Sequence, residues 1–343
     1  QLSRPIYQQL QLHLRGTVLS GDRQRRAQHL SQGGWLGTAW LRALPRREHA
    51  FAREDFLLVL AIFMDLPVAA FDGLRCACGE CLTAFTAPRH VRRCARFGKR
   101  GKHDDVGCGF DRIIRIISPR ARIRGEGSEA PAIGTRVVEE WVHGQRQLVE
   151  KEVRPDRLLA DMPGDAPSDR RVVDFSVPDE TAPTYSDRRA GGSADTPLYA
   201  AGKVHAAKTE FYGAPGVLGV HDRLMPVVVE MDGGVHQSVR DQLWEWTLAA
   251  CGGRQRAGAT QRAGRIMGVL QLEWAVTLAR TRVAYLRAAL DSLDRWERAR
   301  QPVAEGQLGR PQRESQVGVI MRSDSALAWC ESRIRTGGLG SAG

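Results

Sequence analysis

Hydrophobic residues recur at helical spacing in three parts of this chain. Residues 35–44 place Trp and Leu three or four positions apart and end at Pro45, so they predict a helix. Residues 53–65 form an apolar run that predicts a buried helix ending before Pro67. Residues 262–298 carry a broad apolar stripe, which predicts a long helix that packs against the rest of the protein.

Between the second and third of these helices, short β-branched runs are typical of strands. A helix is predicted at 198–212, between the last two strand candidates, so those two strands are expected to form a parallel crossover pair with both faces of the sheet covered. A further helix is predicted at 235–250. The strand candidates are 136–142, 148–153, 157–160, 171–177 and 225–230.

The bulk composition indicates a globular protein with a real core. The chain has 343 residues and 42% hydrophobic content, yet no run approaches the ~20 apolar residues of a membrane span. No secretory signal is visible, and the first residue is Gln1, so we expect a piece of a longer polypeptide. Cysteines in such a protein are expected to stay reduced, which favours metal binding over disulfides.

Cysteine and histidine cluster tightly in one segment. Cys78, His90 and Cys94 have the spacing of metal ligands, and either Cys76 or Cys81 supplies the fourth position. Thiolates and imidazole at this spacing predict a tetrahedral structural zinc ion. The alternatives are a reduced cluster without metal, or disulfides if the protein were secreted.

Positive charge follows this cluster. The chain has a net charge of +11, and the segment 89–124 holds twelve Lys and Arg against three Asp. A basic block beside a zinc knuckle is typical of proteins that bind a phosphate backbone. The alternative is a solvated, arginine-rich surface without a nucleic-acid partner.

Two aspartates are candidates for metal-dependent chemistry. Asp156 follows one strand candidate, and Asp174 lies inside the next strongly apolar one, flanked by Val and Phe. A hairpin that returns Asp174 beside Asp156 would form an oxygen-ligand site for Mg²⁺ or Mn²⁺. Otherwise Asp156 is an ordinary turn residue after proline, and Asp174 is an outward-facing residue of a half-exposed strand.

The predicted helix 198–212 carries two lysine candidates for the same site. Lys208 shares a mostly apolar face with Val204 and Tyr212, and a lysine at a core-facing position needs a carboxylate partner. Lys203 falls on the neighbouring face. We therefore favour Lys208, and the alternative for either is a surface lysine without a role in catalysis.

The ordered series of these segments resembles the C-terminal region of a non-LTR retrotransposon polyprotein, the type with a restriction-like endonuclease after its reverse transcriptase. The resemblance spans about residues 30 to 295. The stretches that carry it are Gly33-Gly-Trp-Leu-Gly-Thr-Ala-Trp-Leu-Arg-Ala-Leu-Pro45, the Cys/His knuckle with Lys102-His-Asp-Asp105, Arg154-Pro-Asp156, Val173-Asp-Phe-Ser-Val177, Lys203-Val-His-Ala-Ala-Lys-Thr-Glu-Phe-Tyr212, and Val227-Val-Val-Glu230 with Gly233-Gly234.

This resemblance implies a PD-(D/E)XK fold, in which the catalytic lysine is often displaced onto the following helix. Ser176 stands where the lysine of the plain motif would be, so Lys208 or Lys203 would be the catalytic lysine. Asp156 and Asp174 would bind Mg²⁺ or Mn²⁺, and the knuckle would grip DNA or RNA. The implied reaction is nicking of target DNA in the nucleus to prime reverse transcription, with the element's RNA and reverse transcriptase as partners.

The expected fold is therefore α/β, with a restriction-endonuclease-like mixed sheet flanked by helices. The expected parts are a helical segment (1–74), a CCHC zinc knuckle with a basic segment (75–125), the endonuclease domain (135–298) and a disordered tail (299–343). The alternative function is a catalytically inactive nucleic-acid-binding module, which a decayed copy of the element would also become. A third possibility is a purely structural zinc domain.

Overall fold

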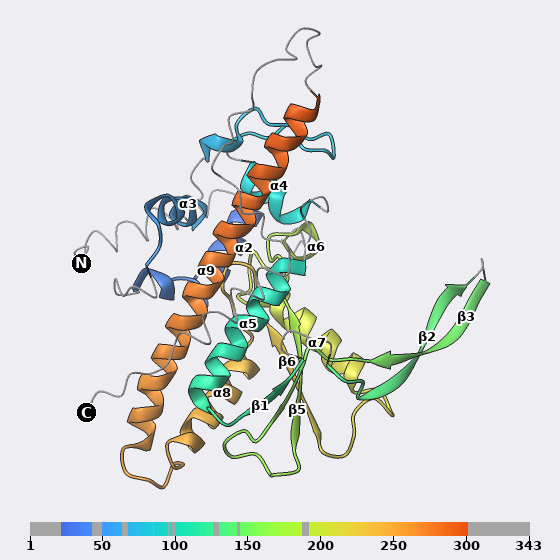
Figure 1. Ribbon diagram of the computed structural model, residues 1–343, viewed down its shortest axis with the longest axis vertical. Helices are drawn as coiled ribbons and strands as arrows, with labels where there is room; N and C mark the ends of the chain where they lie inside the picture. Colours follow the sequence, from blue (N-terminus) through green and yellow to red (C-terminus); the bar gives the residue numbers. More distant parts are fainter. Residues whose placement is uncertain are drawn as a thin grey trace, which may run out of the picture. The chain divides into compact units, whose positions relative to one another are not determined.

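The described residues form two compact units. The computed structural model describes residues 22–42, 50–63, 68–84, 86–94, 97, 100–125, 130–142, 145–186 and 192–300 (Figure 1). The larger unit holds the described residues of 1–66 and 102–284, and the smaller unit holds those of 67–101 and 285–343. Residues 1–21 of the expected helical segment and 301–343 of the expected tail lie outside the described residues.

The larger unit combines helices and strands. Its helices are α2 (Arg23–Gln32), the 3-10 helix η1 (Ala39–Arg42), α3 (Arg53–Phe63), α5 (Arg100–Ile117, from its third residue), α6 (Pro183–Ser186), α7 (Tyr199–Tyr212), α8 (Gln237–Ala250) and most of α9 (Ala259–Arg300). Its strands are β1 (Arg122–Arg124), β2 (Gly134–Val142), β3 (Gln145–Val153), β4 (Arg157–Ala160), β5 (Arg170–Ser176) and β6 (Asp222–Val228). The smaller unit contains the 3-10 helix η2 (Ala69–Phe71), α4 (Ala87–Arg93) and the end of α9.

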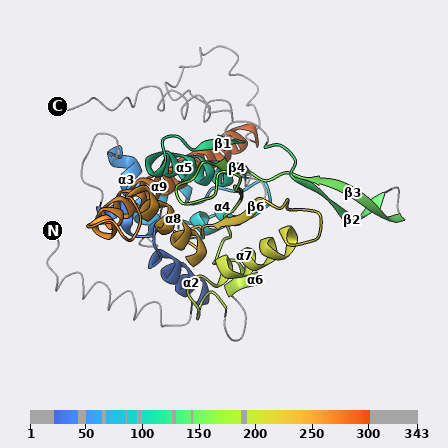
Figure 2. The ribbon, with the colours of Figure 1, turned by 90° about the horizontal axis from the view of Figure 1, so that it is seen from below.

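A mixed four-stranded sheet with the order β1-β4-β5-β6 forms the centre of the larger unit. The pairs β1–β4 and β4–β5 are antiparallel, whereas β5 and β6 are parallel and are connected through α7. The predicted parallel crossover pair is therefore confirmed, as is an α/β fold with a mixed sheet flanked by helices. In Figures 1 and 2, α7 lies beside β6, at the opposite side of the sheet from β1.

The two faces of this sheet pack against different helices. Val173 and Phe175 of β5 belong to the main core, together with Phe110 of α5 and Trp274 of α9. The alternating residue Val172 packs with Leu158 of β4 and Tyr212 of α7 on the opposite face. Side chains of one strand alternate between the faces, so Asp174 shares the α7 face with Val172.

The predicted helix over residues 35–44 is wrong. Residues 33–38 form turns and η1 follows, while residues 43–49 lie outside the described part of the chain. A Cβ on Gly37 would lie 2.0 Å from the carbonyl oxygen of Gln32, so this turn requires glycine. The Leu36 amide also donates to the Gly233 carbonyl at 3.0 Å. The segment therefore folds back on the loop after β6 instead of extending α2.

The remaining element predictions agree with the structure to within a few residues. The helices predicted at 53–65, 198–212, 235–250 and 262–298 correspond to α3, α7, α8 and α9, with residues 64–65 outside the described residues. Helix α5 and strand β1, within the segment expected to be only basic, were not predicted. None of the described helices is long and apolar enough to cross a membrane.

Strands β2 and β3 form a separate two-stranded hairpin. Their register runs from Gly134 opposite Val153 to Val142 opposite Gln145. Most of its side chains face solvent, and Trp141 is 69% exposed. Val153 at its base is buried with Leu158 and Tyr212. The hairpin is thus anchored at its base, and its distal part extends away from the central sheet (Figure 1).

A buried ion pair connects α5 to the start of β4. Arg157 Nε donates to Asp111 Oδ2 at 2.9 Å, and the two side chains are only 12% and 3% exposed. Arg157 Nη1 also donates to the carbonyl oxygens of Gly125 and Asp156, each at 2.8 Å. A buried charge is tolerated when it is paired and hydrogen-bonded in this way.

Removing one partner of this pair should strongly destabilise the larger unit. Arg157→Leu leaves the Asp111 carboxylate buried without its cation, and we expect a loss of about 3–5 kcal/mol in the free energy of unfolding. The control is Arg122→Leu, which breaks an ion pair with Asp161. In that pair the side chain of Arg122 is 65% exposed and that of Asp161 is 40% exposed. That change should cost less than about 1 kcal/mol. Urea unfolding measures both free energies, and equal losses for the two variants would contradict the assignment of Arg157 and Asp111 as a buried, stabilising ion pair.

Candidate functional site

The antiparallel pairing of β4 with β5 brings two aspartates together. Arg157 lies opposite Val173, so Asp156, which precedes β4, meets Asp174 of β5. The two carboxyl groups are close enough that each shifts the pKa of the other. The amide of Phe175 also donates to Asp156 Oδ2 at 2.5 Å. Both candidates from the sequence therefore lie in one carboxylate cluster, on the α7 face of the sheet.

Helix α7 adds a cation and a phenol to this cluster. Lys208 Nζ lies 2.5 Å from Asp174 Oδ2, and their side chains are 16% and 20% exposed. Tyr212 is buried, and its pKa is raised first by burial and then by its interaction with Asp174, so its hydroxyl lies near that carboxylate. Lys203, the other lysine candidate, is exposed and lies over the ring of Tyr199, 5.6 Å from its centroid. The structure thus brings Lys208, and not Lys203, to the aspartates.

His103 of α5 is a member of the cluster that the sequence did not single out. Its Nε2 lies 3.1 Å from Asp156 Oδ2, and its ring contacts Phe175 edge-on at 5.9 Å between centroids. His103 lies three and seven residues before the buried Val106 and Phe110, on the buried face of α5. That spacing would have indicated an inward-facing histidine, had the helix been recognised.

The charges of the cluster depend on one another. Burial and the neighbouring Asp156 together raise the pKa of Asp174 to about 6, against the lowering effect of Lys208. Burial would also raise the pKa of Asp156, but hydrogen bonds from His103, Asp174 and the Phe175 amide lower it overall. The hydrogen bond to Asp156 raises the pKa of His103. Of the two carboxyl groups, Asp174 is therefore the one that more readily keeps a proton.

This donor set fits a hard divalent cation. Mg²⁺ and Mn²⁺ prefer carboxylate oxygens, and the pairing of β4 with β5 brings two carboxylates into one cluster. A cation there would offset the burial and the neighbouring Asp156, which both raise the pKa of Asp174. The cluster thus places two carboxylates, the donor type that such a cation prefers, beside a lysine ammonium.

The second candidate site, in the smaller unit, is built from three cysteines and a histidine. The Sγ atoms of Cys76, Cys78 and Cys94 and a ring nitrogen of His90 all lie within 4.8 Å of one another. Cys76 Sγ is 3.8 Å from Cys94 Sγ, and Cys78 Sγ is 3.5 Å from His90 Nε2. Tetrahedral zinc separates two sulfur ligands by about 3.8 Å and sulfur from nitrogen by about 3.5 Å. The cluster could therefore bind zinc.

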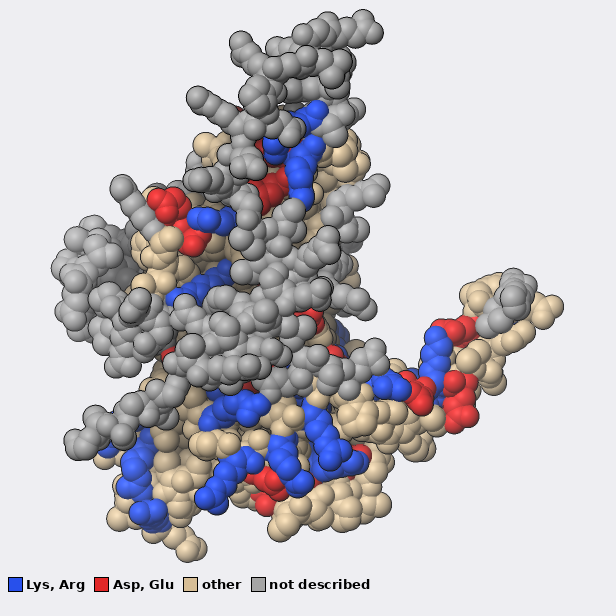
Figure 3. Space-filling model, in the orientation of Figure 1, with Lys and Arg blue, Asp and Glu red and all other residues tan. Residues whose placement is uncertain are grey.

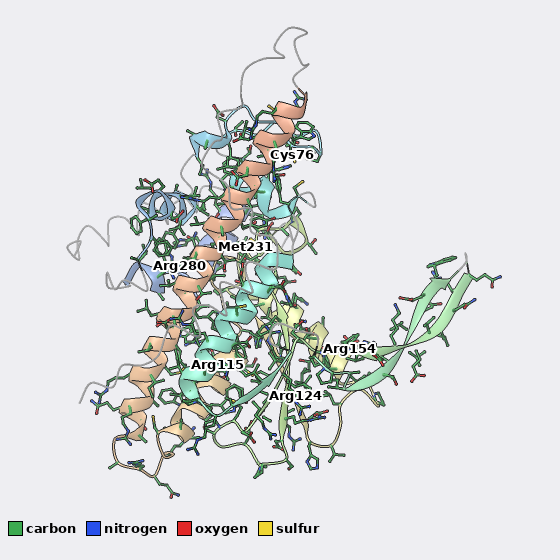
Figure 4. All side chains as sticks on the ribbon, viewed as in Figure 1. Cys76, Arg115, Arg124, Arg154, Met231 and Arg280 are labelled. Carbon is green, nitrogen blue, oxygen red and sulfur yellow. The ribbon has the colours of Figure 1, made fainter. Side chains whose placement is uncertain are left out.

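The local fold decides which cysteine completes this site. His90 lies in α4 and Cys94 follows its last turn, while Cys76 and Cys78 lie in a tight turn closed by a hydrogen bond from the Gly79 amide to the Cys76 carbonyl, at 2.8 Å. Cys76, labelled in Figure 4, is buried. Cys81 is exposed and lies outside the cluster. The structure therefore brings Cys76, and not Cys81, to the fourth position of the cluster.

Comparison with known proteins does not add to this geometry. The chain matches no protein family, no curated protein and no solved structure.

The geometry of the zinc site predicts different effects for substitutions of two nearby cysteines, Cys76 and Cys81. Cys76→Ser removes a buried ligand, so we expect the purified protein to lose its zinc and the smaller unit to unfold at a lower temperature. Cys81→Ser, three residues from Cys78 but outside the cluster, should keep both. Zinc content after dialysis and thermal unfolding measure the outcome. Loss of zinc in the Cys81 variant with retention in the Cys76 variant would reverse the ligand assignment.

Proposed function

We propose that this chain is a metal-dependent DNA endonuclease of a retroelement, which nicks target DNA to prime reverse transcription. The observation that carries the proposal is the cluster of Asp156, Asp174 and Lys208, in which two strands and the crossover helix supply two carboxylates and an ammonium. The mixed sheet with helices on both faces is compatible with a restriction-endonuclease-like PD-(D/E)XK fold. The sequence resemblance to the C-terminal region of a non-LTR retrotransposon polyprotein supports the same proposal.

The proposed reaction is hydrolysis of one phosphodiester bond. The oxygen of a water molecule bonds to phosphorus, the P–O3′ bond breaks, and the proton of the water passes to the 3′ oxygen. The products are a 3′-hydroxyl, from which a reverse transcriptase extends, and a 5′-phosphate. Mg²⁺ or Mn²⁺ bound at the carboxylates would supply a Lewis acid for the phosphoryl oxygen and a nucleophile at neutral pH.

The residues around the carboxylates have distinct roles in this proposal. Lys208 places a positive charge beside Asp174, where it would offset the charge that develops on the phosphoryl oxygens. Tyr212 places its hydroxyl near Asp174, and His103 holds Asp156 through Nε2. Because these groups come from α7 and α5, the aspartates keep their orientation before the DNA arrives.

The proposed partners follow from the chain's charge and its zinc site. A net charge of +11 favours a polyanion, and the Cys/His cluster would give the smaller unit a fixed fold with which to grip DNA or the element's RNA. The reverse transcriptase would belong to the same polyprotein. Action on chromosomal DNA would take place in the nucleus.

One observation favours a second candidate, a nucleic-acid-binding module without catalysis. The aspartates already have partners within the cluster, since Lys208 pairs with Asp174 and His103 contacts Asp156, as a purely structural network would require. In that case the basic surfaces would capture DNA or RNA and no phosphodiester bond would be cut. A purely structural zinc domain, the third possibility, would bind no nucleic acid even at low salt.

Isosteric substitution of the aspartates separates these functions. We expect Asp156→Asn and Asp174→Asn to abolish Mg²⁺-dependent nicking of duplex or branched DNA, because an amide loses the charge that holds the cation. The affinity for DNA should change little. Nicking of supercoiled plasmid and a parallel binding titration measure both properties. Wild-type protein that binds DNA but nicks no substrate with Mg²⁺ or Mn²⁺ would establish the binding module instead.

The two lysines of α7 provide a matched pair for the catalytic role. Lys208→Ala removes the ammonium next to Asp174, and we expect kcat to fall by about 100-fold or more. Lys203→Ala removes an exposed lysine one turn away and should leave kcat within about twofold. Single-turnover nicking rates measure the difference. Equal effects of the two changes would exclude Lys208 from the reaction.

A further inference from the structure

The α7 face of the sheet carries a row of arginines next to the carboxylate cluster. Arg124 of β1 lies opposite Leu158 of β4, which lies opposite Val172 of β5. Arg122, two residues earlier in β1, lies opposite Ala160 and is on the same face as Arg124. Arg170 of β5 is on this face as well, since it alternates with Val172 and Asp174.

These arginines are accessible because α7 covers only part of the face. Helix α7 lies beside β6, whereas β1 is the strand at the other edge of the sheet (Figure 2). Arg124 is exposed, and the side chains of Arg122 and Arg170 are 65% and 48% exposed. Figure 3 shows Lys and Arg side chains gathered around β1, and Figure 4 labels Arg124 there.

The strands also enclose a shallow hollow beside these side chains. Its volume is about 220 Å³, and the three arginines line it together with Ser168 and the carboxylate-bearing Asp169. A hollow with several guanidinium groups and a hydroxyl offers hydrogen-bond donors of the kind that bind phosphate oxygens.

The carboxylates on this surface are already paired with arginines. Arg122 binds both oxygens of Asp161, and Arg170 Nε donates to the buried Asp222 at 2.8 Å. Asp169 lies 3.8 Å from the guanidinium of a fourth arginine, Arg223. Arg124 has no ion pair or hydrogen bond with any described residue. The positive and negative charges of these pairs therefore cancel, and the guanidinium of Arg124 gives the surface its net positive charge.

We propose that Arg124, with Arg122 and Arg170, binds the backbone phosphates of the DNA strand that is cut at the carboxylate cluster. This proposal rests on the proposed nuclease function, because the cluster defines the scissile phosphate. A strand advances about 3.3 Å per residue, so the row of Arg124 lies about 7 Å from that of Asp174, and the row of Arg122 and Arg170 about 13 Å. DNA advances about 3.4 Å per nucleotide. The contacted phosphates are therefore two to four nucleotides from the nick, on one side of it.

A phosphate contact at Arg124 has a signature in salt dependence. Arg124→Ala should reduce the slope of log K for DNA binding against log salt by about 0.9, the value for one phosphate. Arg265→Ala is the matched control, because Arg265 of α9 is an exposed arginine away from this surface. Its slope should equal that of the wild type. This measurement needs no nicking, so it tests the surface even if the proposed nuclease function fails.

Neutral phosphates in the substrate test the position of the contact. Methylphosphonates placed two to four nucleotides from the mapped nick should raise KM for the wild type, and Arg124→Ala should be insensitive to the replacement nearest the nick. On an unmodified substrate, Arg124→Ala should raise KM about two- to fivefold with kcat unchanged, and Arg124→Lys should restore most of the loss. A variant with the wild-type salt slope, or with the wild-type interference pattern, would overturn the proposal.

Discussion

The buried guanidinium of Arg157 organises the larger unit around the carboxylate cluster. Its ion pair with Asp111 connects β4 to α5, and its Nη1 joins the carbonyl oxygens of Gly125 and Asp156. The same group lies 5.7 Å from the ring centroid of Phe175, whose amide holds the Asp156 carboxylate. A charge at this depth is stable only with all its partners in place. Asp156 is therefore fixed from both its backbone and its side chain.

The cluster assembles because one sheet combines antiparallel and parallel pairing. The antiparallel turn from β4 to β5 brings Asp156 to Asp174, and the parallel crossover to β6 lays α7 over the same face. The side chain of Lys208 can then be largely buried, since Asp174 compensates its desolvation. Neighbouring residues of β5 point to opposite faces of the sheet, with Asp174 on the α7 side and Phe175 in the main core. The carboxylate cluster and the main core therefore lie on opposite faces of the sheet, because side chains alternate along β5.

Much of this arrangement was predictable from local patterns, and the exceptions have physical causes. A Val-rich strand that contains an aspartate indicates a partner for the charge, and helical spacing distinguished Lys208 from Lys203. Helix α5, and His103 with it, was missed because glycines interrupt its apolar stripe. One of them, Gly109, is needed because a Cβ there would lie 2.8 Å from the Trp274 ring. Tertiary packing, not helix propensity, determines this helix.

The fourth zinc ligand and the turn at residues 33–38 could not be predicted from local sequence patterns either, because both depend on how the backbone turns in the folded protein. Cys76 and Cys81 stand on either side of Cys78, at two and three residues, and both spacings can supply ligands. The choice depends on a turn in which Gly79 adopts a positive φ of 100°. The Trp and Leu spacing at 35–44 includes two residues of the core, Leu36 and Trp40, but also Leu41, which is 44% exposed. It did not show that Gly37 must approach the Gln32 carbonyl.

The position of Gly125 shows how the proposed nuclease activity could be lost over generations. Its φ is +94°, and a Cβ at this position would lie 2.4 Å from the carbonyl oxygen of Asp156. Any side chain there would displace the backbone of the aspartate while every charged residue of the cluster stayed unchanged. An inactivated copy could therefore retain an intact set of acidic and basic residues. An inventory of those residues alone would misclassify it as competent.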